Sequence, residues 1–118
     1  MKPGTYVTQE EIENAWRELG AFRFATWEFL PDTGDVRVNG KVHYRLSETE
    51  AETLKVLINA FPMPVTVKQV IKRMRLTGTY WNSDTVKVIV SRLRARLTPE
   101  IIETIPRGYR FNPEAVLG

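Results

Sequence analysis

The sequence predicts a single α+β domain in which a small antiparallel sheet is followed by three helices and a closing hairpin. Three observations lead to this fold class. Short runs of branched and aromatic residues between Arg23 and Leu46 are separated by tight-turn signals, which is typical of antiparallel strands. Apolar residues between 47 and 97 then recur at helical spacing. The end of the chain, 101–111, returns to branched and aromatic residues around a Pro-Arg-Gly turn.

Size and composition limit the kinds of protein that this chain can be. Its 118 residues, 42% of them hydrophobic, suffice for one modest core and not for two independent domains. No apolar run approaches the roughly 18 residues that cross a bilayer, and the N-terminus lacks the apolar core of a secretory signal. Because cysteine is absent, disulfides, thiol nucleophiles and sulfur-bound zinc are excluded. We therefore expect a cytoplasmic protein that has no contact with membranes.

Residue patterns typical of catalysis or metal binding are missing. His43 is the only histidine, so a histidine metal site or a Ser/His pair would lack its partners. We expect His43 to be an ordinary half-buried strand residue. The acids Glu48, Glu50 and Glu52 are explained by helix capping and solvation. Since no phosphate-binding glycine loop is present either, we predict that the chain is not an enzyme and uses no cofactor, metal or small-molecule substrate.

Residues 1–22 are predicted to form a helical extension to the main domain, which we place at 23–118. Thr8 and Glu11 make a capping box, and Gly20 can end the helix that this box begins. The apolar face of this helix comprises Ile12, Ala15, Trp16 and Leu19. Two interpretations of the face stay open: it packs back on the sheet, or it pairs with another copy of the chain as a homodimer.

Three strands are expected between Arg23 and Leu46. The runs "RFATWEFL", "DVRV" and "KVHYRL" alternate or cluster branched and aromatic residues. They are separated by "PDTG" and by "NG", and the second of these is a strong signal for a tight hairpin. These runs predict the small antiparallel sheet.

Two helices are expected to follow the sheet. The first begins at Ser47, which forms a capping box with Glu50, and it ends before two prolines. Its buried stripe comprises Ala51, Leu54, Leu57, Ile58 and Phe61. The second begins at Thr66, which pairs with Gln69 in the same way. Its inward residues are Val67, Val70, Ile71 and Met74.

The segment "SDTVKVIVSRLRARL", Ser83 to Leu97, combines branched residues with three alternating arginines. A strand of this length would be more than twice as long as usual. A helix, by contrast, has one continuous apolar stripe, which consists of Val86, Val90, Leu93 and Leu97. We therefore predict a helix whose neighbouring face, Lys87, Ser91 and Arg94, is not needed by the core.

Positive charge is concentrated in the second half of the chain. Residues 1–67 hold 7 basic and 10 acidic side chains, whereas residues 68–118 hold 10 basic and 4 acidic ones. Such asymmetry indicates a polyanionic partner. The expected elements agree with this, because a helix-turn-helix-like trio ends in the basic helix and is followed by a hairpin with Arg107 at its tip.

The stretches "LSETEAETLKVL", "SDTVKVIVSRLRARL" and "IETIPRGYRF" together resemble the winged-helix effector domain of the OmpR/PhoB response regulators. The resemblance runs from Phe24 to Phe111 and implies a winged helix-turn-helix with an N-terminal sheet, a three-helix core and a C-terminal hairpin as the wing. Response regulators carry a receiver domain before this domain, whereas about 22 residues precede it here. Arg75 and Leu76 stand where the family has a Trp-Gly pair, Lys87 replaces a common acid, and the wing turn is one residue shorter.

The resemblance implies a sequence-specific double-stranded DNA-binding transcriptional regulator, from a bacterium or a virus of bacteria. The third helix would enter the major groove, and the wing would contact the backbone or the adjacent minor groove. The residues implied for DNA binding are Lys87, Ser91, Arg92, Arg94, Thr104, Arg107 and Tyr109. Two of these have an alternative that stays open: Tyr109 as an aromatic residue of the core, and Thr104 as an ordinary strand residue. Because forked donors suit guanine and a hydroxyl suits several acceptors, we assign base reading to Arg94 and Ser91, and phosphate binding to Lys87 and Arg92. RNA polymerase is the partner implied for the loop of Gly78, Thr79, Tyr80, Trp81 and Asn82.

A second interpretation from a different class stays open. A winged-helix module can also meet a protein partner or single-stranded nucleic acid. Single-strand binders stack bases on exposed aromatic rings in a basic groove. Tyr80 and Trp81 are the only aromatic residues near the basic helix, so their exposure favours this interpretation and their burial opposes it.

The two interpretations of the N-terminal face predict different masses in solution. A dimer face predicts a dimeric wild type and a monomeric Trp16→Asp variant, because a buried carboxylate opposes association. A face that packs on the sheet predicts monomers in both cases. Size-exclusion chromatography with light scattering, together with circular dichroism to verify folding, measures the difference. If both proteins are folded monomers, the homodimer interpretation is wrong.

Overall fold

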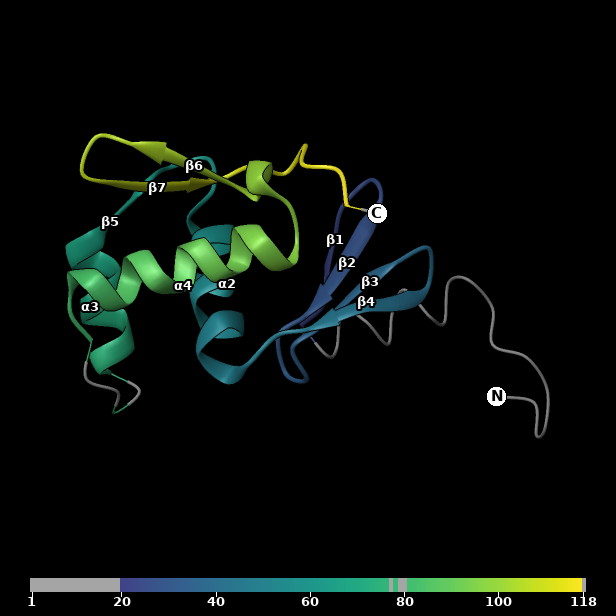
Figure 1. Cartoon of the computed structure of the whole chain (residues 1–118), viewed down its shortest axis with the longest axis horizontal. Helices are drawn as coiled ribbons and strands as arrows, with labels where there is room; N and C mark the ends of the chain where they lie inside the picture. Colours follow the sequence, from purple (N-terminus) through teal and green to yellow (C-terminus); the bar gives the residue numbers. More distant parts are fainter. Residues whose placement is uncertain (1–19, 77, 79–80, 118) are drawn as a thin grey trace.

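The computed structural model describes residues 20–76, 78 and 81–117. The predicted N-terminal helix and its face of Ile12, Trp16 and Leu19 lie outside the described residues. In Figure 1 the three helices lie together, a small sheet lies along one side of the last helix, and a larger sheet lies beyond the end of that helix. The α+β class and the order sheet, three helices, hairpin are confirmed.

The larger sheet is antiparallel and consists of β1 (Phe22–Arg23), β2 (Trp27–Leu30), β3 (Asp35–Val38) and β4 (Lys41–Arg45), in that order. The "NG" turn joins β3 to β4, with φ of 53° at Asn39 and 77° at Gly40. Two positive φ angles at the central residues are the mark of a type I′ hairpin turn, as the sequence predicted. One detail differs from expectation, because His43 is exposed on β4 and not half-buried.

Asp35 is a buried carboxylate at the start of β3. Its Oδ1 accepts a hydrogen bond from Arg45 Nε at 2.7 Å across the β3–β4 pair. This hydrogen bond, with smaller contributions from the nearby charge and from Thr33, holds the pKa of Asp35 below its ordinary value although burial opposes the shift. The bond joins the two strands at the end distant from their turn.

The three helices are α2 (Glu48–Ala60), α3 (Val67–Arg75) and α4 (Ser83–Arg96). The capping boxes predicted at Ser47 and Thr66 are both present, since each side chain accepts the N3 amide and the N3 side chain accepts in return. Asn82 caps α4 in the same way. The predicted starts of the three helices are therefore confirmed, because the caps satisfy amide groups that have no partner inside a helix.

The core lies between the three helices, the inner face of the larger sheet and the wing. The whole predicted stripe of α4 is buried, and Ile89 is buried beside it. From the stripe predicted for α2, Ala51, Leu54 and Leu57 are buried, whereas Phe61 is partly exposed and packs against Phe111. The C-terminal tail closes the core, with Trp27 Nε1 donating to the carbonyl of Ala115 at 3.2 Å.

The wing is a three-stranded sheet and not an isolated hairpin. Strands β6 (Ile102–Ile105) and β7 (Gly108–Phe111) form the predicted hairpin, and β5 (Val65–Thr66), which the sequence did not predict, pairs with β7. A short helix, η1 (Pro99–Ile101), leads into β6. A Cβ at Gly108 would lie 2.1 Å from the Val65 carbonyl oxygen, so the absence of a side chain permits the close pairing of β5 and β7.

Glu50 corrects the expectation that its carboxylate is solvated. The side chain is fully buried: Oε1 accepts the amide of Ser47 at 2.9 Å, and Oε2 pairs with Nη1 of Arg96. The Arg96 guanidinium also lies 5.2 Å from the ring centroid of Tyr44 on β4. The capping part of the expectation is confirmed, but a buried ion pair to α4 is added, since a buried carboxylate requires a partner.

We predict that Glu50→Ala lowers the free energy of unfolding by about 3–5 kcal/mol, because it leaves the Arg96 charge without its partner. Glu50→Gln keeps a capping acceptor and loses only the charge, so it separates the cap from the ion pair. Glu48→Ala, an exposed acid on the same turn, is the matched control and costs less than about 1 kcal/mol. Urea titration followed by circular dichroism measures all three, and an equal loss for Glu50→Ala and Glu48→Ala contradicts the prediction.

Candidate nucleic-acid interface

The free side of α4 carries three of the residues predicted to bind DNA. Lys87, Ser91 and Arg92 are exposed, whereas the stripe on the opposite side of the helix is buried. The helix keeps this division over its whole length because successive residues are rotated by a constant angle. The basic helix therefore offers cationic and hydroxyl donors on a surface that the core leaves free.

Val88 and Ala95 are also exposed on this side, and the sequence analysis did not select them. Val88 is 46% exposed, although valine is usually buried. Val88, Ser91 and Ala95 are three and four positions apart, so they form one row on the side of the helix opposite the buried stripe. The sequence carries a signal for this, since Val88 does not belong to the apolar stripe, but an apolar side chain lacks the charge and the donors that point to a DNA contact.

Arg94 lies at the edge of the free side and reaches the wing. Its Nε and Nη2 both donate to the carbonyl oxygen of Ile102, at 3.2 and 2.8 Å. Nη2 also donates to Thr104 Oγ1 at 2.7 Å, and the guanidinium carbon lies 5.9 Å from the ring centroid of Tyr109. The structure thus brings together three predicted residues, Arg94, Thr104 and Tyr109, in a single cluster between α4 and the wing. Tyr109 is buried at 9% exposure.

Arg107 occupies the turn between β6 and β7. It is exposed, and its φ of 69° lies in the left-handed region that glycine favours. Pro106 precedes it, and a proline followed by a positive φ is the pattern of a type II turn. The Arg107 carbonyl accepts the amide of Val67 at 3.1 Å, so the wing turn is attached to the first residue of α3. The exposed side chain is consequently carried on a fixed backbone.

The predicted polymerase-contact loop is only partly described. Thr79 and Tyr80 lie outside the described residues. Gly78 is exposed, Asn82 is exposed as the cap of α4, and Trp81 is 1% exposed within the core. The Trp81 ring therefore cannot stack on a base or meet a partner while the domain keeps this structure.

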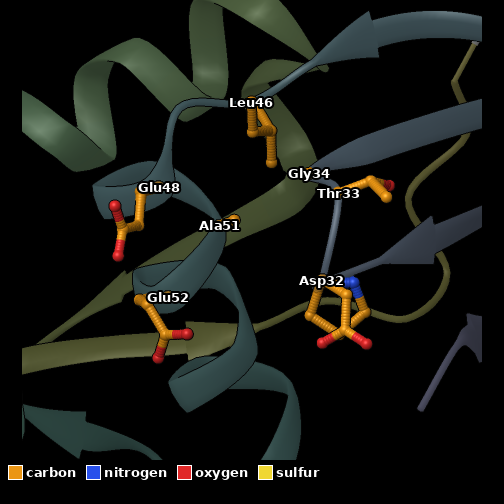
Figure 2. A pocket seen from close by; sticks show the side chains of 8 residues that line it. Asp32, Thr33, Gly34, Leu46, Glu48, Ala51 and Glu52 are labelled. Atoms are coloured by element: carbon orange, nitrogen blue, oxygen red, sulfur yellow. The ribbon is translucent and has the colours of Figure 1, made fainter. Parts of the chain in front are cut away.

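Three acidic side chains lie around a depression whose lining residues are all outside α4. A depression of about 340 Å³ lies between the β2–β3 turn and the start of α2, and Figure 2 shows Asp32, Glu48 and Glu52 around it. Its electrostatic character is unsuited to a polyanion. In the part of the chain that the structure covers, no group of three His, Cys, Asp or Glu side chains is placed to hold a metal ion. The helices within that part are also too short or too polar to cross a membrane.

Comparison with protein families finds one match. The family model described as "Transcriptional regulatory protein, C terminal" matches residues 40–111, from the β3–β4 turn to the last residue of β7. The matched segment contains all three helices and the complete hairpin of the wing. Comparison with curated proteins gives no significant match.

Solved structures of similar fold include the C-terminal domain of a response regulator and two DNA-binding domains. The C-terminal domain of the nisin resistance regulator NsrR is 21% identical, with 79% of this chain and 97% of that chain covered and a TM-score of 0.68. The DNA-binding domain of CpxR from E. coli is 18% identical, with coverage of 80% and 98% and a TM-score of 0.63. The DNA-binding domain of Klebsiella pneumoniae RstA, solved in complex with the RstA box, is 22% identical, with coverage of 80% and 98% and a TM-score of 0.65. At these identities the likeness shows a common fold.

Proposed function

The chain belongs to the transcriptional regulatory protein C-terminal family, the DNA-binding winged-helix domains of OmpR/PhoB type, and from this premise we propose how it reads its duplex. The family consists of DNA-binding domains of transcriptional regulators and not of enzymes. In our proposal α4 lies in the major groove and the wing lies on the adjacent backbone or minor groove. The observation that carries the proposal is the free side of α4, which bears Ser91 with Lys87 and Arg92 on its flanks, while the stripe on the other side of the helix is buried.

The dimensions of α4 suit this role. Its 14 residues correspond to a rod about 21 Å long and about 10–12 Å across, close to the width of the major groove of B-DNA. Lys87 and Arg92 lie on the flanks of the free side, where phosphates are within reach, while Ser91 lies nearer the middle. We therefore keep the assignment of base reading to Ser91 and of phosphate binding to Lys87 and Arg92.

Val88 adds an apolar contact that the sequence analysis did not include. A side chain in the middle of the free side faces the floor of the groove, where thymine presents its methyl group. The exposed methyl groups of Val88 supply the matching surface. We propose that Val88 favours thymine at the base pair that it meets.

The wing supplies the second contact to the duplex. Arg107 is exposed at the turn, and its positive φ is a conformation that costs an arginine roughly 1 kcal/mol or more. Glycine would avoid this cost, so the presence of an arginine supports a role for its charge. We propose that Arg107 contacts the backbone or the minor groove, with Thr104 beside it, as the resemblance implies.

Three partners other than duplex DNA can be compared with the structure: RNA polymerase, single-stranded nucleic acid and a second copy of the chain. Exposed Gly78 and Asn82 support an RNA polymerase contact at the loop before α4, but buried Trp81 cannot take part. The burial of Trp81 also opposes the single-stranded nucleic-acid interpretation, which needs exposed rings beside the basic helix. We also keep the homodimer as a proposal, and the Trp16→Asp experiment tests whether two copies associate through the N-terminal face.

Lys87→Ala is expected to weaken binding to all duplexes by a similar factor, because a phosphate contact carries no sequence information. The slope of log K against log salt becomes shallower by about one unit. Fluorescence anisotropy with one selected and one unrelated duplex, at several salt concentrations, measures both quantities. Lys41→Ala, an exposed lysine on β4, is the control and leaves the slope unchanged. An unchanged slope for Lys87→Ala contradicts major-groove docking of α4.

Replacing thymine by deoxyuridine in a selected duplex removes only the methyl group. At the base pair that Val88 meets, this change weakens wild-type binding about fourfold, the value of one buried methyl group. Val88→Ser binds the thymine duplex less tightly and no longer distinguishes the two bases. Systematic single replacements along the duplex locate the position by anisotropy. If Val88→Ser keeps the full discrimination at every position, another residue reads the methyl group.

A further inference from the structure

The wing sheet has two edge strands. The strand order within the described residues is β5-β7-β6, so β6 forms the edge on the side of α4 and β5 forms the other edge. On the other edge, β5 pairs with β7 through only two residue pairs, Val65 with Tyr109 and Thr66 with Gly108. Along that side the wing is held by this pairing, by the bond from the Val67 amide to the Arg107 carbonyl and by the packing of β7 on α2.

Arg94 ties the opposite side. Its guanidinium donates twice to the Ile102 carbonyl oxygen and once to Thr104 Oγ1, and both acceptors belong to β6. The plane of the guanidinium lies near the Tyr109 ring, which is on β7. One side chain of α4 therefore contacts both strands of the hairpin. Three charge-assisted donations in a planar group fix direction as well as distance.

This geometry assigns to Arg94 the role of a positioning residue: we propose that Arg94 fixes the wing relative to α4, so that Arg107 reaches the duplex when α4 occupies the groove. The inference rests on the proposed function, and it gives Arg94 a role other than the base reading expected from the sequence. A guanidinium that already donates to the carbonyl and hydroxyl of β6 offers fewer donors to a guanine. The residue acts on DNA through the wing.

A comparison with Arg92 isolates this role. Both arginines lie on α4, two residues apart, but among the described residues the structure gives Arg92 no hydrogen bond or ion pair with the wing. Arg92→Ala removes a cation from the DNA-facing side without releasing β6. Arg94→Ala removes a cation and releases β6. Thr104→Val keeps every charge and removes one of the two acceptors in the bridge between Arg94 and β6.

The test is a double-mutant cycle on the duplex that wild type selects from random-sequence DNA. Arg107→Ala is measured alone and combined with Arg94→Ala or with Arg92→Ala. We expect Arg94→Ala to diminish the effect of Arg107→Ala roughly fivefold or more, since a released wing no longer places Arg107 correctly. The Arg92→Ala combination is additive within about twofold. Thr104→Val diminishes the Arg107 effect to a smaller extent than Arg94→Ala.

Two further measurements decide between positioning and direct contact. Arg94→Lys keeps the charge but cannot make the forked contact with β6. If Arg94 positions the wing, the lysine does not restore the coupling to Arg107 that is lost in Arg94→Ala. If Arg94 contacts a phosphate, the lysine largely restores binding. Replacing guanines by 7-deazaguanine removes an acceptor in the major groove and affects wild type and Arg94→Ala equally. Additive behaviour of Arg94 and Arg107, restoration by lysine, or loss of the 7-deazaguanine effect in Arg94→Ala overturns the proposal.

A measurement without DNA keeps this inference separate from the proposed function. Amide hydrogen exchange of 102–105 is expected to accelerate in Arg94→Ala and to stay unchanged in Arg92→Ala, because only the first change releases β6. Equal exchange in the two variants refutes the bridge itself, whether or not the protein binds DNA. If exchange accelerates in Arg94→Ala and the wild-type protein binds no duplex, the bridge between Arg94 and β6 is supported and only the proposed function is contradicted.

Discussion

The buried carboxylate of Glu50 is the interaction on which the geometry of the domain depends. Through its two oxygens it caps the start of α2 and pairs with Arg96 in the last turn of α4, and Arg96 in turn lies over Tyr44 of the larger sheet. A charge buried without a partner is costly, so an arrangement of α2 and α4 that separates Glu50 from Arg96 is strongly destabilised. The end of α4 is thereby fixed against α2 and β4, and this fixes the direction in which the free side of α4 points.

The two ends of α4 are held by different chemistry. At its start, Asn82 supplies a neutral cap and Trp81 is buried in the core, whereas the last turns use arginines to reach α2 and the wing. Three arginines at alternate positions therefore have three environments: Arg92 faces solvent, Arg94 bridges to β6, and Arg96 enters the ion pair. Because alternate residues on a helix are rotated by about 200°, neighbouring arginines in sequence diverge in space. A count of basic residues on this helix consequently overstates the charge available to a polyanion.

Local sequence signals predicted the elements well, and long-range pairing explains what they missed. The capping boxes at Ser47 and Thr66 and the "NG" turn concern residues within four positions of one another, so the chain alone specifies them. The pairing of β5 with β7 joins residues more than 40 positions apart and leaves no local pattern. The same is true of Glu50 with Arg96. Glu50 looked like a solvated capping residue because its second partner is visible only after folding.

The wing shows why the residues of the interface were harder to predict than the fold. Exposure decides which side chains can meet a duplex, and exposure is a property of packing: Val88 is free although it is apolar, and Tyr109 is covered although it is near the basic helix. Arg107 is free because the type II turn holds it outward, while Gly108 beside it permits the close approach to Val65 that fixes the turn. An arginine in a strained conformation next to an obligatory glycine indicates that the backbone of the tip is over-determined. Rigidity there reduces the entropy lost on binding, so a short wing can contribute affinity from a single exposed charge.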